Sequence, residues 1–342
     1  MKDSPNLDFL RAVAVLAVFG GHLAWRIGFH SEFLLNLSHL GVVIFFVHTA
    51  LVLMFSLERL SADGEGNVIK RFYVRRAFRI YPLATVCVLT VFAIETLQGR
   101  LPAERAVKIL ISNLLLIQNI TQARSLPSPL WSLPFEVQMY LLLPLVFLAV
   151  RHLSPLRGAG IAAIGIAYIL ALALSRKVLL VQYFPCFLAG VVAYVTWRTV
   201  RARIAWPWWP SLILATAAVY STWGTQKRSD WIAALTVGLA VPLFRQISWR
   251  WLAEAARIVA QYSYGIYLFH SPLSAVVFGQ DWPSVLKWSL YLALTAAIPV
   301  AAYHFLEAPL IRAGARLADS RREKRNSTEV AISPEGDVSR AI

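Results

Sequence analysis

Long apolar runs constrain the fold of this chain more than any other feature of its sequence. About ten of them recur along the 342 residues, most of them near the roughly 20 residues with which a helix crosses a bilayer. They cover residues 7–25, 40–58, 80–97, 133–150, 158–174, 178–197, 208–224, 230–244, 258–278 and 285–305. Hydrophobic residues make up 58% of the chain and charged residues only 15%. We therefore predict an all-α integral membrane protein with about ten transmembrane helices.

The distribution of basic residues predicts how these helices are oriented. In membrane proteins, Lys and Arg collect in the cytoplasmic loops and set the orientation of the helices. We therefore attribute the net charge of +15 to this role and expect no nucleic-acid partner. One further segment, 107–120, is short and contains Ser112, Asn113, Gln118 and Asn119. If it does not cross the bilayer and the N-terminus is cytoplasmic, most of the 33 Lys and Arg residues lie inside. We therefore predict two cytoplasmic termini, and a re-entrant or surface helix at 107–120 on the outer side.

The chain divides into a membrane part and a tail. Residues 1–312 hold all the apolar runs, and we predict that they form one membrane domain. Residues 313–342 are too poor in apolar residues to fold alone and predict a disordered cytoplasmic tail. The first run lacks a small-residue cleavage site, which favours a retained span over a removed signal peptide. Cys87 and Cys186 lie inside apolar runs and are interpreted as packing residues, with no disulfide or metal implied.

The first apolar run carries three polar groups, Asp8, Arg11 and His22. Arg11 and His22 are eleven positions apart, which is about 16 Å of helix rise and close to three full turns. Both side chains therefore lie on one face of the helix. Charge within a membrane helix is costly and usually faces the bundle interior or a water-filled path. A snorkelling Arg11 and a packed His22 explain the pair equally well on the sequence alone.

Three other places in the chain contain candidate functional residues. Arg76 and Arg79 share a helix face at the cytoplasmic mouth of the third run, where they either set orientation or bind a polyphosphate. Glu136 and Tyr140 are one turn apart behind Trp131. The Glu136 carboxylate either orients an imidazole or transfers protons, or it caps the N-terminus of its helix. His270 lies deep in a late apolar run, whereas Glu307 is interpreted as a charge-paired helix end.

Taken in order, these motifs resemble the bacterial acyltransferase-3 family, integral-membrane O-acyltransferases that modify surface and exported glycans. The resemblance covers about residues 6–312. It rests on LDFLR with the Arg11–His22 spacing, FFVHTALVL, RRAFRIYP, LWSLPFEVQMYLLLP, YSYGIYLFHSPL and LEAPL. Family sequences tend to have glycine where this chain has Phe9 and Ala12, Ser-Gly where it has Thr49-Ala50, and a second carboxylate where it has Val137. These departures concern acceptor geometry or donor preference more than the type of reaction.

The resemblance implies a multi-pass protein of the bacterial cytoplasmic membrane that uses acetyl-CoA or another acyl-CoA as co-substrate, with no permanently bound cofactor and no metal. The donor would enter from the cytoplasm, with Arg11, Arg76 and Arg79 near its phosphates. His22, with Glu136, would act in transfer to an acceptor hydroxyl, either as a base or through an acyl-histidine. Asp8, Trp131, Tyr140 and His270 are candidates for acceptor contacts or for support of these groups. In this layout the basic residues lie inside, and Trp131, Glu136 and Tyr140 lie near the outer face.

The expected partners are acyl-CoA, a glycan or lipid-linked glycan acceptor, the lipid bilayer, and other proteins of glycan synthesis or export. Two alternatives remain open. The acceptor could instead be a small lipid or a macrolide-like molecule. A glycan transporter or flippase would also place charges inside the membrane, but we see no repeated half-structure or paired broken helices of the kind such proteins contain.

Overall fold

The computed structural model describes residues 4–63, 67–151, 165–166, 170, 182–223 and 227–319, and this part of the chain contains helices and no strand. The helices are α1 (Pro5–Arg26), α2 (Glu32–Ala62), α3 (Val68–Leu97), α4 (Ala103–Leu114), α5 (Gln118–Thr121), α6 (Leu133–Arg151), α8 (Phe184–Trp197), α9 (Trp208–Trp223), α10 (Lys227–Ala240), α11 (Arg250–Phe278), α12 (Ser284–Ala302) and α13 (Ala308–Asp319). Short 3-10 turns cover Ser128–Ser132 and Val241–Leu243, and a π-helical turn covers Tyr303–Glu307. The predicted all-α class is confirmed.

Several of these helices have the length and composition of membrane spans. Those long and apolar enough are Pro5–Arg26, Glu32–Ala62, Val68–Leu97, Ser128–Arg151 and Ser284–Asp319, and Phe184–Trp197 and Ser229–Leu243 are shorter apolar helices. The predicted run 158–174 lies almost entirely outside the described residues. The count of ten spans and the cytoplasmic position of both termini therefore stay predictions.

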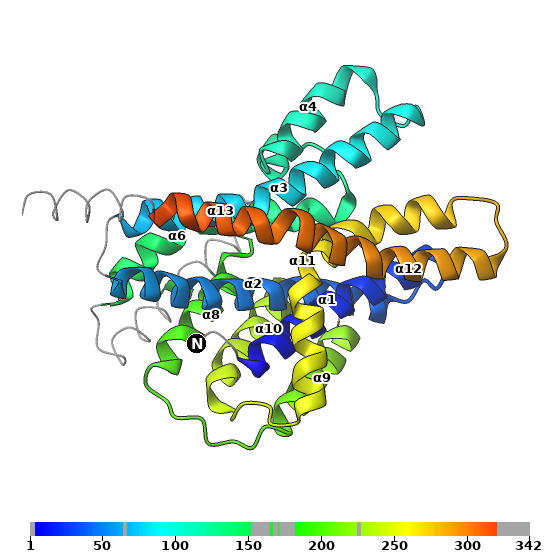
Figure 1. The fold of residues 1–342 in the computed structure, drawn as a ribbon. Coiled ribbons are helices and arrows are strands. Elements are labelled where there is room, and N and C mark those ends of the chain that lie inside the picture. Colours follow the sequence, from blue (N-terminus) through cyan, green and yellow to red (C-terminus); the bar gives the residue numbers. More distant parts are fainter. Residues whose placement is uncertain are drawn as a thin grey trace, which may run out of the picture.

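Helix α2 forms the centre of the bundle. Its sequence is apolar on all sides, a pattern typical of a helix surrounded by protein, and 78% of its apolar window is buried. It packs against α1, α8, α9, α10 and α6, and Figure 1 shows α1, α8 and α10 beside it. Helix α1 in turn packs along α11. Helix α1, which carries Asp8, Arg11 and His22, therefore lies between α2 and α11, the helix that carries His270.

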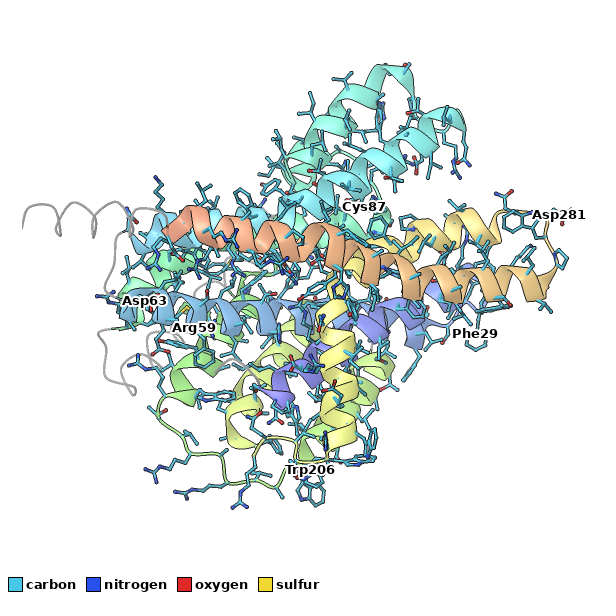
Figure 2. The ribbon with its side chains drawn as sticks, viewed as in Figure 1. Phe29, Arg59, Asp63, Cys87, Trp206 and Asp281 are labelled. Atoms are coloured by element: carbon cyan, nitrogen blue, oxygen red, sulfur yellow. The ribbon has the colours of Figure 1, made fainter. Side chains whose placement is uncertain are left out.

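The two ends of the bundle can be followed through labelled residues. Figure 2 shows Phe29 and Asp281, in the turns after α1 and α11, at one end of the molecule. Arg59 and Asp63, at the end of α2, lie at the opposite end. The basic loops predict that the end with Arg59 is inside and the end with Phe29 is outside, and this orientation stays a prediction.

The segment 107–120 forms a short helix and a turn. Helix α4 has 12 residues, a rise of about 18 Å, which is short of the roughly 30 Å of a bilayer core. Figure 1 shows it projecting from the bundle beside the outer half of α3. The amide of the buried Asn113 donates to the carbonyls of Ile109 and Arg124 and accepts from the backbone N–H of Leu126. The polar residues of this segment thus fold the chain back, which supports a helix that does not span.

Beyond α4 the chain enters the protein interior before α6 begins. Leu126 and Leu130 are buried, and the side-chain amide of Gln118 donates to the carbonyl of Leu130 at 3.1 Å. The hydroxyl of Tyr267 on α11 donates to the carbonyl of Pro129 at 2.5 Å. The first turn of α6 is consequently held inside the bundle, against α11.

The C-terminal part of the described chain is a helix packed on α3. Helix α13 continues to Asp319, into the stretch for which the sequence predicts a tail, and Figure 1 shows it lying along α3. The carboxylate of Asp319 bonds Arg71 at 2.9 Å and Arg75 at 2.6 Å. These ion pairs order residues 313–319, and the remainder of the predicted tail lies outside the described residues.

Candidate active site

A cleft of about 800 Å³ opens at the end of the bundle where α2 finishes. Its walls come from α1, α2, α3, α11 and the π-helical turn. Five arginines line it, against the two carboxylates of Asp8 and Asp63: Arg11, Arg59, Arg75, Arg79 and Arg257. By the predicted orientation this end is cytoplasmic. A concave, strongly basic surface of this kind attracts a polyanion from that side.

A deeper and smaller pocket continues from the cleft toward the middle of the bundle. The two cavities share Arg11, His48, Val52 and Arg79 as lining residues. The deep pocket has a volume of about 90 Å³, room for a few water molecules or a small substrate group. Its further lining includes Thr49, Arg76, Ser132, Glu136, Tyr140, Ser263, Tyr264 and Tyr267.

Glu136 faces this deep pocket from the first turn of α6. One carboxylate oxygen accepts from the hydroxyl of Tyr140 at 3.1 Å, and the other lies 3.5 Å from the hydroxyl of Thr49. Negative charge is also favourable at the start of a helix, which fits the interpretation of Glu136 as a residue that stabilises the N-terminus of α6. No described hydrogen bond joins Glu136 to an imidazole.

The arginines of the deep pocket are held differently from one another. Nε of Arg11 donates to Oγ of Ser263 on α11 at 2.6 Å. Arg79 pairs with the buried Glu307 at 2.9 Å, which gives that carboxylate a charge partner, as expected of it. Nε of Arg76 is buried and has no hydrogen-bond partner within the described part of the chain. Arg11 and Arg79 thus each have a protein partner for one guanidinium nitrogen, whereas Nε of Arg76 has none among the described residues.

His22 and His270 meet farther toward the outer end. Nδ1 of His22 lies 2.9 Å from Nε2 of His270, with the rings nearly parallel at 11° and their centroids 5.2 Å apart. Arg11 and His22 both contact α11, which confirms that they share a face of α1. Neither histidine lines the cleft or the deep pocket.

Tyr267 lies between the deep pocket and the histidine pair. It lines the pocket, its hydroxyl is 2.6 Å from the hydroxyl of Ser132, and its ring centroid is 6.2 Å from that of His270. The order from the end of the bundle where α2 finishes is thus cleft, deep pocket, Tyr267 and histidine pair.

The structure differs from the predicted layout in where Glu136 and Tyr140 lie. Both share the deep pocket with Arg11, Arg76 and Arg79, whereas the predicted layout has them near the outer face, apart from the basic residues. The reason is the inward path of the chain before α6, which places the start of this helix inside the bundle. The imidazole partner of His22 is His270, and no described contact joins Glu136 to His22.

The remaining predicted residues do not gather at one place. Asp8 lines the arginine cleft, and Tyr140 lies in the deep pocket. Trp131 stacks on His39, with centroids 5.9 Å apart, and Nε2 of His39 lies 3.3 Å from a carboxylate oxygen of the buried Asp230. Sequence reasoning missed this pair, because its members are 191 positions apart and no motif connects them.

Comparisons with known proteins concern the sequence of the chain. Residues 4–304 match the sequence profile of a family described as "Acyltransferase domain". The chain is 32% identical over 176 residues to the acyltransferase MdmB of Streptomyces mycarofaciens, covering 48% of this chain and 44% of that protein. It is 34% identical over 164 residues to the peptidoglycan O-acetyltransferase OatA of Listeria monocytogenes, covering 43% of this chain and 25% of that protein. The matches thus span less than half the length of these curated relatives, and no solved structure matches the chain.

Proposed function

The chain belongs to this acyltransferase-3 family, and from that premise we propose that it is a membrane O-acyltransferase. It moves an acyl group, acetyl in the first instance, from a cytoplasmic acyl-CoA to a hydroxyl of a cell-surface or exported glycan. The observation that carries the proposal is the five-arginine cleft that adjoins the deep pocket, with Tyr267 in the wall of that pocket next to a pair of imidazoles. A glycan acceptor is supported by the name of one relative, a peptidoglycan O-acetyltransferase.

The cleft suits the phosphorylated end of coenzyme A. Guanidinium groups match phosphate oxygens in shape and charge, and each such charged hydrogen bond contributes about 1.5–3 kcal/mol. Arg59, Arg75 and Arg257 line the wide part of the cleft, and Arg11 and Arg79 line both the cleft and the deep pocket. The pantetheine arm extends from there into the deep pocket, past Arg76.

The acyl group then has to pass Tyr267 and Ser132 to reach His22. His22 accepts the proton of the acceptor hydroxyl while the hydroxyl oxygen attacks the thioester carbonyl carbon. The carbon–sulfur bond breaks, and the coenzyme A thiolate leaves and takes up the proton, so that an ester and a free thiol result. In a two-step variant, His22 first attacks the thioester carbonyl carbon, the carbon–sulfur bond breaks and the coenzyme A thiolate leaves. The acyl-imidazole then passes its acyl group to the hydroxyl, whose proton is taken up by the thiolate, and His22 is regenerated.

The test uses the purified, detergent-solubilised protein with radiolabelled acetyl-CoA. We expect slow hydrolysis or self-labelling by the wild type and its loss in His22→Ala, because a general base contributes about 10²–10⁴-fold. His304→Ala is the matched control, since His304 is exposed and lines neither cavity. Activity near wild type in His22→Ala would remove His22 from the mechanism. No binding or turnover of any short acyl-CoA by the wild type would overturn the proposed function.

A further inference from the structure

The histidine pair is embedded in an aromatic environment that fixes its geometry. Phe19, one turn before His22 on α1, stacks on Tyr291 of α12 with centroids 6.0 Å apart and lies 6.2 Å from the His270 ring. The Tyr291 hydroxyl donates to the carbonyl of His270 at 3.4 Å. His270 itself is 1% exposed. Its ring therefore has one orientation available, and its two nitrogens have fixed neighbours.

The first of these neighbours determines which nitrogen of His270 carries the proton. Nδ1 of His270 lies 3.0 Å from the backbone carbonyl oxygen of Ile266. A carbonyl oxygen only accepts hydrogen bonds, so Nδ1 must be the protonated nitrogen. No carboxylate among the described residues bonds His270, and an unpaired charge at so buried a site is costly. His270 is accordingly neutral, with its lone pair on Nε2.

The proton position of His22 follows from that of His270. Since Nε2 of His270 accepts, Nδ1 of His22 must donate across the 2.9 Å contact. A neutral His22 then carries its lone pair on Nε2. Among the described residues, Nε2 of His22 has no hydrogen-bond partner, so its lone pair is available to a substrate hydroxyl.

We infer that His270 is a positioning residue, which through its bond to the Ile266 carbonyl holds His22 in the tautomer with Nε2 unprotonated. This inference rests on the proposed function for its catalytic meaning, and it specifies which atom of His22 acts as the base. When Nε2 takes the substrate proton, the Nδ1–H of His22 keeps its acceptor on His270. The imidazolium is thereby stabilised without transfer of a second proton.

Replacement of His270 separates this role from simple packing. Glutamine can present its amide oxygen near the place of Nε2, whereas leucine fills similar space without an acceptor. We expect His270→Leu to lower kcat by about 10- to 100-fold, less than the loss of the base itself, with the KM for acetyl-CoA unchanged. His270→Gln should recover most of the rate. His304→Gln is the matched control outside the pair and both cavities.

A measurement independent of turnover reads the tautomer directly. In protein labelled with ¹⁵N-histidine, the His22 ring signals are identified by their loss in His22→Ala. The wild type should show a protonated Nδ1 and an unprotonated Nε2, and His270→Leu should show the other tautomer as well. Tyr267 and Tyr291 contact His270, and Arg26, one turn after His22 on α1, donates from its guanidinium to the Ala275 carbonyl of α11. The spectra are compared between pH 6 and 8.

The outcomes distinguish the two proposals. A wild-type His22 protonated on Nε2, or equal rates for His270→Leu and His270→Gln, would overturn the inference about His270 while leaving the acyltransferase proposal in place. If the wild type showed the expected tautomer of His22 but bound no acyl-CoA, the proposed function would be overturned and the inference about the tautomer would stand.

Discussion

Among the described residues that line the deep pocket, Glu136 is the only carboxylate, and it faces Arg11, Arg76 and Arg79 there. Its charge offsets part of theirs, and its oxygens accept from Tyr140 and Thr49. Glu136→Gln keeps the shape of the side chain and removes the charge, which leaves buried cations less compensated. We expect transfer to fall by about 10²-fold or more while the protein still inserts and folds.

Tyr140→Phe provides the comparison for Glu136→Gln. It removes one hydrogen-bond donor to the carboxylate and leaves the charge in place, so a loss of about tenfold or less is expected. Both variants are measured with acetyl-CoA turnover and with thermal unfolding in detergent. Equal losses in the two variants would mean that the hydrogen bond, and not the charge of Glu136, matters for transfer.

How far single residues could be predicted depended on the sequence distance between partners. Arg11 and His22 lie on one helix, so helical geometry alone placed them on one face. His22 and His270 are 248 positions apart, and no spacing rule states that α1 and α11 pack together. Glu136 was identified as a candidate, but its partners were not, because the path of residues 115–132 into the bundle depends on tertiary bonds such as that of Tyr267 to Pro129.

At the scale of elements, α1 and α2 approach so closely that glycine is required between them. A Cβ on Gly21 would lie 2.6 Å from Cβ of Ser38, whereas a Cβ on the preceding Gly20 would meet nothing within 4 Å. Small residues permit such close approach of membrane helices. The position of His22 on α1 therefore depends on the contact that Gly21 makes with α2.

The two glycines make a matched pair of variants. Gly21→Ala should destabilise the protein by about 1–3 kcal/mol through overpacking and should lower transfer, since His22 moves with α1. Gly20→Ala should be neutral or stabilising by up to about 1 kcal/mol, because alanine favours helix. Thermal unfolding in detergent and acetyl-CoA turnover measure both effects. A Gly21→Ala protein as stable as Gly20→Ala would show that the helices can separate at little cost.

Helices whose own sequence has a distinctive apolar or polar pattern could be predicted, whereas those that depend on contacts with distant helices could not. The apolar pattern identified α2, and the polar residues of 107–120 identified a segment unlike the others. The extension of α13 to Asp319 was missed, because that helix is ordered by ion pairs to Arg71 and Arg75 of α3, and local composition carries no sign of them.

At the scale of the whole molecule, the proposal requires that the arginine cleft face the cytoplasm, where acyl-CoA is made. The orientation can be read by labelling single cysteines with a membrane-impermeant maleimide in intact cells, since native Cys87 and Cys186 are buried and stay unlabelled. Phe29→Cys and Asp281→Cys lie in exposed turns at one end of the molecule (Figure 2) and should be labelled from outside. Glu254→Cys, exposed near the start of α11, should be labelled only after permeabilisation.

Lys108→Cys on the exposed side of α4 completes the set, and it should be labelled from outside together with Asp281→Cys. If Lys108→Cys required permeabilisation while Phe29→Cys did not, the polypeptide between them would cross the bilayer a different number of times from that predicted. Labelling of Glu254→Cys in intact cells would place the start of α11, and the arginine cleft beside it, on the outer side. Because acyl-CoA does not cross the bilayer unaided, that result would exclude the cleft as its binding site and leave the five arginines without the role proposed for them.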